Sequence, residues 1–320
     1  MNIGTDLHKA AQLLRSGKVV AIPTETVYGL AANAFDPEAV IRIYEIKKRP
    51  RFNPLIVHVH SWEMLDRVAA QTDRQLRSLA EAFWPGPLTI LVPRSGLIHS
   101  IVTAGSDLVA VRMPNHPMTL ELMEMLDFPL AAPSANLFGK ISPTTAAHVD
   151  AQLHDQVDYI LDGGTCSVGV ESTIIKINTF GKVEILRPGG ISAEMLASVT
   201  GYIPETNSAH SDTPEAPGML KSHYAPVIPM MLGDILPALE KNSHKKIALL
   251  TFNAAIHHPA VIYQVILSEN SNLHEAARNL FACLHRLEQS GADLILAEKV
   301  PSTGIGAAIN DRLERASADA

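Results

Sequence analysis

The chain has 320 residues, of which 47% are hydrophobic and 18% charged, and its formal net charge is −7. This composition is typical of a soluble globular protein, and the length favours two domains over a single core. The negative charge argues against a broad nucleic-acid-binding surface, although residues 42–51 form a small basic cluster.

The N-terminal 17 residues lack the apolar core of a signal peptide, and no segment approaches the roughly 20 apolar residues of a membrane span. The two cysteines, Cys166 and Cys283, match no metal-binding spacing. We therefore expect a cytoplasmic protein with unpaired thiols and no membrane partner.

Short apolar runs alternate with segments of helical period through the first 200 residues, which predicts an α/β domain. The expected strands are residues 19–22, 55–59, 88–92, 108–111, 129–132, 159–161, 174–177 and 183–186. The expected helices are residues 7–14, 37–46, 73–83, 117–126, 143–149 and 193–199. Asp36-Pro37 and Ser142-Pro143 have the cap-then-proline pattern of a helix start. The turn at Gly181 joins two adjacent strands and makes a mixed sheet the better prediction.

The composition changes after residue 201. Residues 202–226 hold four prolines among small polar residues, which predicts a linker without regular structure. The last ten of these residues also include Met, His and Tyr, which favours a lid. Residues 227–320 return to strands at 227–232, 247–250, 260–266 and 294–296, with helices at 272–288 and 307–316. We therefore predict a first α/β domain over 1–201, a linker and lid over 202–226, and a smaller Rossmann-like α/β domain over 227–320.

Seven segments of the first domain interrupt apolar runs with cations, hydroxyls or proline-fixed turns. They are Pro-Thr-Glu-Thr-Val-Tyr-Gly-Leu (23–30), Lys-Lys-Arg-Pro (47–50), Asn-Pro-Leu-Ile-Val-His (53–58), Val-Arg-Met-Pro (111–114), Pro-Ser-Ala-Asn (133–136), Val-Glu-Ser-Thr (170–173) and Leu-Arg-Pro-Gly-Gly (186–190). Because strand ends gather at one edge of an α/β sheet, we expect one cleft that binds a small polyanion. No Walker A loop, kinase signature or zinc-protease motif is present, so a nucleotide would be bound by dispersed side chains.

Each segment also has an ordinary structural explanation. Lys47 and Arg49 could complement a helix dipole, and Arg112 could form a structural ion pair. A guanidinium at the end of a buried strand equally suits a carboxylate or phosphate. Ser134 could form a turn, and a lone strand histidine such as His58 is more often structural than catalytic.

Together and in this order, the segments closely resemble the threonylcarbamoyl-adenylate synthase family in its two-domain form. The resemblance covers about residues 10–226, including His-Tyr-Ala-Pro at 223–226, and continues more loosely to the C-terminus. It implies a twisted mixed α/β sheet of the YrdC-like type, followed by a linker and a Rossmann-like domain. It also implies a nucleotidyltransferase that makes threonylcarbamoyl-AMP and pyrophosphate from L-threonine, bicarbonate and ATP. The product would serve N6-threonylcarbamoyladenosine formation at tRNA position 37, completed by a separate transferase complex.

The same resemblance implies roles for particular residues. Threonine would be bound by Thr26, His58, Arg112, the backbone of Ala132, and Ser172. ATP would be bound by Arg49, Asn53, the backbone of Leu108, Ser134, Ser142, Arg187 and, from the linker, Tyr224. Lys47 and Arg49 would be the catalytic cations. Magnesium is expected to arrive with ATP rather than to be fixed by protein side chains, and no organic cofactor is implied.

The chain departs from the family pattern at Ala31, at Phe138 and at residues 220–222. Of these, Phe138 bears on the shape of the nucleotide pocket. The partners of the enzyme would include RNA, bound weakly. Two alternatives stay open: a non-catalytic RNA-binding module on the same fold, with salt-dependent RNA affinity and no ATP turnover, and a carbamoyltransferase that acts on another protein. The low aromatic content, 5%, speaks against the first. The lack of further zinc-finger or acylphosphatase-like segments speaks against the second.

Overall fold

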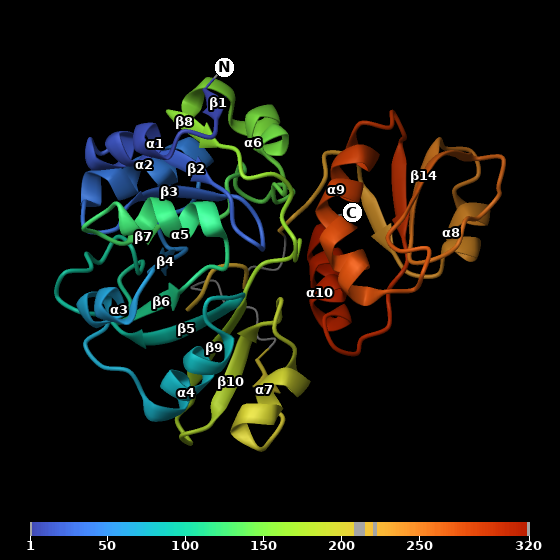
Figure 1. The fold of residues 1–320 in the computed structure, drawn as a ribbon. Coiled ribbons are helices and arrows are strands. Elements are labelled where there is room, and N and C mark those ends of the chain that lie inside the picture. The colour runs from blue at the N-terminus through green and yellow to red at the C-terminus, as the bar shows by residue number, and fades with distance from the viewer. Residues whose placement is uncertain (1, 208–214, 220–222, 319–320) are drawn as a thin grey trace.

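The computed structural model describes residues 2–207, 215–219 and 223–318. Among these residues the strands form two sheets, one of eleven strands and one of four. The large sheet belongs to the first domain and the small sheet to the second, and the two domains lie side by side (Figure 1). Within the described ranges, no helix has the length and apolar character needed to span a bilayer.

The large sheet is mixed, as predicted. Its spatial order is β1-β8-β2-β3-β7-β4-β6-β5-β9-β10-β11. The strands are β1 (Ile3–Gly4), β2 (Val20–Ile22), β3 (Gly29–Asn33), β4 (Ile56–His58), β5 (Leu88–Pro93), β6 (Leu108–Arg112), β7 (Leu130–Ala131), β8 (Tyr159–Leu161), β9 (Thr173–Ile177), β10 (Val183–Arg187) and β11 (Glu205–Thr206). Strands β4 and β6 pair in parallel, whereas β9 and β10 form an antiparallel hairpin.

Seven α-helices and one short 3-10 helix of the described chain pack against this sheet. They are α1 (Leu7–Arg15), α2 (Pro37–Lys47), α3 (Trp62–Val68), α4 (Arg74–Phe83), α5 (Pro117–Glu124), α6 (Ala146–Leu153), η1 (His154–Gln156) and α7 (Ala193–Thr200). The expected start of α2 is confirmed, because the Asp36 side chain caps it and Pro37 is its first residue. The start expected at Ser142-Pro143 is wrong: α6 begins at Ala146, where the hydroxyl of Thr145 accepts the His148 N–H.

The sequence did not predict strands β1, β3 and β11, nor helices α3 and, in the second domain, α8 (Ile235–Lys241). Strand β3 is rich in alanine and glycine, which have low strand propensity, and it exists because β2 and β7 pair with it on either side. Strand β11 lies in the segment expected to lack regular structure. It pairs in parallel with β10, so the first sheet extends to residue 206.

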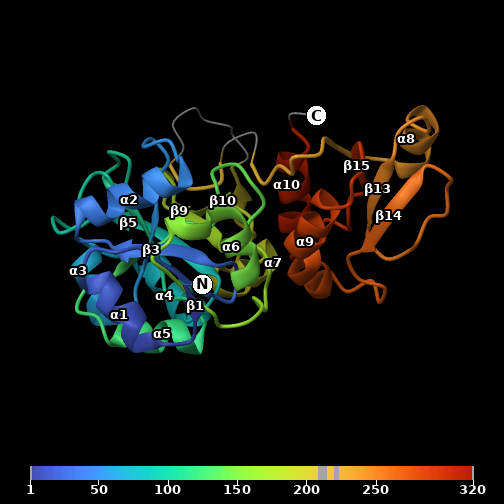
Figure 2. The same ribbon diagram turned by 90° about the horizontal axis from the view of Figure 1, so that it is seen from above.

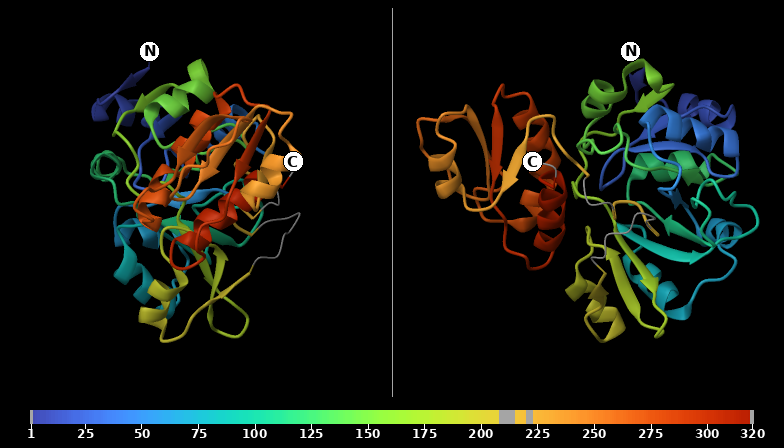
Figure 3. Two further views of the ribbon diagram at one scale, coloured as in Figure 1. Left: turned by 90° about the vertical axis from the view of Figure 1, so that its right-hand side faces the viewer. Right: turned by 180° about the vertical axis from the view of Figure 1, so that it is seen from behind.

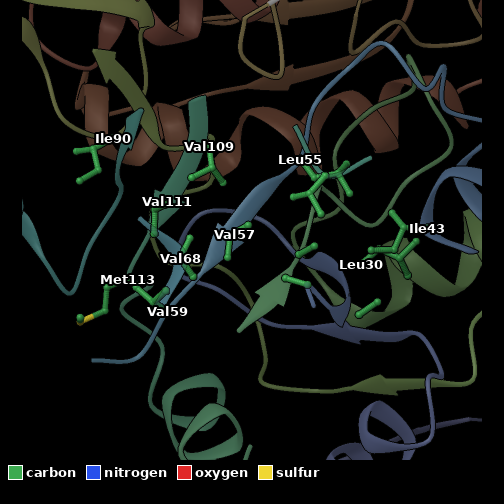
Figure 4. Packing of buried hydrophobic residues seen from close by; sticks show 14 of the residues in the cluster. Leu30, Ile43, Leu55, Val57, Val59, Val68, Ile90, Val109, Val111 and Met113 are labelled. Atoms are coloured by element: carbon green, nitrogen blue, oxygen red, sulfur yellow. The ribbon is translucent and has the colours of Figure 1, made fainter. Parts of the chain in front are cut away.

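The alternation of side chains along the central strands separates the core from the site. Val57, Val109, Val111 and Ile90 point into the main hydrophobic core, together with Leu30, Ile43, Leu55, Val59, Val68 and Met113 (Figure 4). Their strand neighbours point to the opposite face, where the linker residues Ala216 and Met219 cover them. Because His58 and Arg112 lie two residues beyond Ile56 and Ala110 in these strands, they share that second face.

The second domain is a parallel four-stranded sheet with the order β12-β15-β13-β14. Its elements are β12 (Met230–Leu232), α8 (Ile235–Lys241), β13 (Ile247–Thr251), β14 (Val261–Ile266), α9 (Leu273–Glu288), β15 (Leu294–Ala297) and α10 (Gly306–Ala316). Helices α9 and α10 lie between this sheet and the first domain (Figure 2), and the view from behind shows the same arrangement (Figure 3).

The two domains share one hydrophobic cluster. Val27, Ile141 and Val170 of the first domain belong to the same buried cluster as the core residues of α9 and α10. The imidazoles of His148 and His285 stack across the interface with ring centroids 4.1 Å apart. The domains are therefore packed against each other through an apolar interface rather than joined by a linker alone.

Gly169 lies directly against the backbone of α9 in the second domain. A Cβ added there would lie 2.3 Å from the Cα of Arg278 and 2.6 Å from the carbonyl oxygen of Ala277, both backbone atoms of α9. We expect Gly169→Ala to displace α9 and to lower the melting temperature by several degrees, since backbone cannot yield as a side chain can. Calorimetry on the full chain measures this.

Gly164→Ala is the matched control. Gly164 lies in the same loop and has nearly the same φ, +81° against +80°, but a Cβ there meets no atom within 4 Å. Both variants carry the same backbone penalty, so equal melting temperatures would contradict the close contact.

Candidate active site

A pocket opens on the second face of the large sheet, where β4 and β6 end and β9 begins. Nine of the thirteen predicted site residues line it: Thr26, Arg49, His58, Arg112, Ala132, Ser134, Ser172, Arg187 and Tyr224. The described linker residues Pro217, Gly218 and His223 complete its wall. Three guanidinium groups from distant parts of the sequence thus converge on one pocket, which is the arrangement expected for a small polyanion.

Arg112 is held at the floor of the pocket by three partners. One guanidinium nitrogen, Nη2, lies 2.6 Å from Glu25 Oε1, and Nη1 donates to the hydroxyl of Thr26 at 2.9 Å. The Nε–H group donates to the carbonyl of Gly86 at 3.2 Å. Arg112 therefore forms the structural ion pair that the sequence left open, and it also faces the pocket.

His58 lies beside Arg112 because the parallel pairing of β4 and β6 places them in register. Burial, together with the adjacent Arg112 charge, lowers the pKa of His58 to about 3. The imidazole is therefore neutral near pH 7. A neutral imidazole can donate one hydrogen bond and accept another, which suits a hydroxyl or carboxylate group.

Arg187 links the sheet to the linker segment. Its Nε and Nη2 donate to the carbonyl oxygen of Ser172 at 3.2 and 2.9 Å, and its Nη1 donates to the carbonyl of Pro217 at 3.1 Å. Burial lowers the pKa of Arg187 to about 10, so the group stays charged at neutral pH. Gly218, with φ of +83°, allows the linker segment to pass directly over this side chain.

Arg49 is aimed into the pocket by Asn53. The amide oxygen of Asn53 accepts from Arg49 Nη2 at 2.6 Å, and the backbone carbonyls of Asn53 and Pro54 take further hydrogen bonds. Asn53 does not itself line the pocket. Phe138, where the chain departs from the family pattern, packs its ring 5.7 Å from the Arg49 guanidinium and 5.8 Å from the ring of His223.

The structure places three other predicted residues outside the pocket lining. Lys47 is buried, and its ammonium donates to the carbonyls of Ser134 and Asn136 at 2.5 Å each, so it fixes that loop. Leu108 begins β6, about 13 Å along the strand from Arg112 at roughly 3.3 Å per residue. Its N–H donates to Ser106. Ser142 donates its hydroxyl to Glu171 Oε1 at 2.7 Å.

Two carboxylates at this site were not singled out from the sequence. Glu25 and Glu171 lie in the segments 23–30 and 170–173. They were not predicted as site residues because a cleft that binds an anion is expected to present cations and hydroxyls. Burial opposes the ionisation of Glu171, yet the nearby Arg312 and Arg187 charges lower its pKa below the usual value. Arg312, on α10, was also missed; the available signal was an arginine three residues after buried Ile309, on the apolar side of the helix.

The comparisons with known proteins place the chain in a family. A family model described as "Telomere recombination" matches residues 12–189, and one described as "Threonylcarbamoyl-AMP synthase, C-terminal domain" matches residues 191–318. The fold and pocket define a two-domain protein of the YrdC-like class. The chain belongs to the threonylcarbamoyl-AMP synthase family.

Relatives match over nearly the full length. The threonylcarbamoyl-AMP synthase of Pyrococcus abyssi is 42% identical, covering 96% of this chain and 93% of the relative. That of Bacillus subtilis is 39% identical, covering 97% and 92%. The crystal structure of P. abyssi Sua5 complexed with L-threonine has a TM-score of 0.90 at 40% identity, covering 97% of this chain and 94% of that one.

Proposed function

We infer that this protein makes threonylcarbamoyl-AMP and pyrophosphate from L-threonine, bicarbonate and ATP. The observation that carries the inference is the convergence of Arg49, Arg112 and Arg187 on one pocket, in a chain that matches threonylcarbamoyl-AMP synthases over nearly its full length. The product is an activated group for tRNA modification.

We propose that threonine lies over the ends of β4 and β6, on the face of the sheet that carries His58 and Arg112. Its carboxylate would pair with Arg112, whose position is fixed by Glu25 and Thr26. Neutral His58 and the hydroxyl of Ser172 would form hydrogen bonds with the amine and hydroxyl groups of the amino acid. The backbone of Ala132 lines the same side of the pocket.

We propose that ATP lies toward the lid. Arg49 and Arg187 line that part of the pocket with Ser134 and Tyr224, and bidentate hydrogen bonds favour arginine for phosphate oxygens. Three predicted residues would act indirectly. Asn53 would hold Arg49, Ser142 would hold Glu171, and Lys47 would hold the loop at Ser134. Leu108 would have no direct part.

Magnesium would fit this site as part of the nucleotide. The two carboxylates beside the pocket, Glu25 and Glu171, are already paired with Arg112 and Arg312. We therefore propose that the ion is held by the ATP phosphates, where it would neutralise part of their charge. The side chains of the protein would add the remaining positive charge.

The chemistry follows from positioning. The threonine amine attacks the carbon of bicarbonate; as the C–N bond forms, the amine gives up a proton and a hydroxyl leaves the carbon as water, which yields a carbamate. A carbamate oxygen then attacks the α-phosphorus of ATP, and the bond to the β-phosphate oxygen breaks to release pyrophosphate. Among the described residues that line the pocket, the carboxylate is that of Glu171, which is already paired with Arg312, so catalysis would rest on orientation and on fixed positive charge. A closed lid would keep water from the carbamate.

One incubation series tests this function. The protein is mixed with ATP, bicarbonate and each amino acid in turn, and pyrophosphate release is measured. We expect release with threonine alone, lost when bicarbonate is removed. Release with no amino acid dependence, or salt-dependent RNA binding without any ATP turnover, would contradict the proposal.

We propose that the product passes to a separate transferase that modifies tRNA, in the cytoplasm, where ATP and tRNA are available. Weak direct contact with tRNA belongs to the same proposal. The exposed side chains of Arg51 and Phe52, in the loop that follows Arg49, are the candidate contact.

A further inference from the structure

Arg312, on α10 of the second domain, is a charged residue that contacts two residues of the pocket lining, Glu171 and Tyr224. Its side chain is fully buried, and it is the largest fully buried side chain among the described residues. Nε donates to Glu171 Oε2 at 2.8 Å, across the domain interface, and Nη1 donates to Asp311 at 2.5 Å. The guanidinium carbon lies 5.3 Å from the ring centroid of Tyr224. Both Glu171 and Tyr224 line the pocket, whereas Arg312 does not.

Such a pair is poorly explained by stability alone. Removing two charges from water is costly, and well-packed apolar residues commonly stabilise an interface as well as a buried ion pair does. The surrounding interface is already apolar, with Val27, Ile141 and Val170 packed against the second domain. A charge buried here therefore indicates a role at the neighbouring pocket.

The role follows from what Glu171 contacts. Its Oε1 accepts the hydroxyl of Ser142, and its neighbour in the chain, Ser172, supplies the carbonyl that holds Arg187. Without Arg312, Glu171 would be a buried carboxylate with no guanidinium bonded to it. The other cation whose charge acts on Glu171 is Arg187, and the Glu171 charge in turn influences the pKa of Arg187. A negative charge in the wall would also repel phosphate groups.

We propose that Arg312 is a positioning residue through which the second domain controls ATP affinity. It neutralises Glu171, so that Arg187 keeps its place on Ser172 and Pro217 and faces phosphate there, and its guanidinium lies against the ring of Tyr224. This proposal rests on the proposed function, in that the ligand of Arg187 is taken to be ATP. It gives the second domain a part in the reaction without any contact with substrate.

The test uses three variants of the full chain: Arg312→Met, Glu171→Gln and the double variant. The dissociation constants of ATP and of threonine are measured separately by calorimetry, and melting temperatures are recorded. We expect Arg312→Met to weaken ATP binding at least tenfold and to change threonine binding less than twofold. Because a glutamine at position 171 carries no charge to neutralise, the double variant should bind ATP within about threefold of Glu171→Gln alone.

Lys299→Met is the matched control, because it removes one positive charge from the second domain at a half-exposed position that pairs with Glu314. It should leave ATP binding unchanged. A merely structural Arg312 would lower the melting temperature and leave the ATP constant intact, or would weaken ATP and threonine equally; either result overturns the proposal. So does an Arg312→Met defect that Glu171→Gln fails to relieve.

If Arg312→Met does not fold, Glu171→Gln in the otherwise unchanged chain decides the matter. Loss of the Glu171 charge should then leave ATP binding equal to or tighter than that of the unsubstituted protein, and weaker binding would overturn the proposal. Failure of the proposed function is recognised separately, because the unsubstituted protein would then release no threonine-dependent pyrophosphate.

Discussion

Replacing Arg112 by methionine is expected to reduce threonine- and bicarbonate-dependent pyrophosphate release by roughly a hundredfold to a thousandfold. Removing one partner of a buried ion pair lowers the free energy of unfolding by about 3–5 kcal/mol, because the other charge stays buried and unpaired. Here the remaining charge would be Glu25, beside the place proposed for the threonine carboxylate. The loss of Arg112 also removes a charge that lowers the pKa of His58. Initial rates of pyrophosphate release measure the effect.

Arg77→Met is the control for this prediction. Arg77 is a partly exposed residue of α4 that pairs with Glu81 one helical turn away and stacks on Trp62, and neither contact reaches the pocket. Its rate should stay within twofold of the unsubstituted protein. Arg49→Ala should also abolish turnover, but through ATP. A folded Arg112→Met protein with an unchanged rate would show that the floor of the pocket does not bind threonine.

Substituting Gly218 by valine is expected to weaken ATP binding at least tenfold and to reduce turnover with it. A Cβ at this position would lie 2.9 Å from Arg187 Cδ and 3.2 Å from the Tyr224 hydroxyl. Arg187 cannot move aside freely, because Ser172 and Pro217 hold its guanidinium. The lid would therefore no longer seat over the pocket. Titration with ATP, with threonine binding measured in parallel, checks this.

Gly201→Val separates the contact from the backbone penalty. Gly201 has φ of +78°, close to the +83° of Gly218, but a side chain there would meet open space. Each substitution costs about 1–3 kcal/mol in left-handed backbone. Equal ATP affinity in both variants would contradict a lid that closes through Gly218. This comparison is preferable to truncation, because deleting the second domain would expose Val27, Ile141 and Val170.

Much of the fold could be read from the sequence because its signals are local. Each of these signals occupies only a few consecutive residues. Examples are the apolar runs of β4, β5 and β6, and the cap and proline at the start of α2. The missed elements lack such signals. Strand β3 owes its conformation to strands β2 and β7, and β7 lies about a hundred residues away along the chain. Propensity alone cannot anticipate pairing of that kind.

By itself the sequence determined the family, the order of the main elements and most of the residues that meet at the pocket, since ordered motifs and hydrophobic periodicity are properties of neighbouring residues. Only the tertiary structure decided how those residues are used. In the folded protein Lys47 holds the loop at Ser134, and Leu108 lies at the far end of β6 from the pocket. Arg312 contacts Glu171 from the second domain. The physical reason is separation along the chain: Arg112 and Thr26 are 86 residues apart, and Arg312 and Glu171 are 141. Side chains that are so far apart in the sequence come into contact only once the core between them has folded.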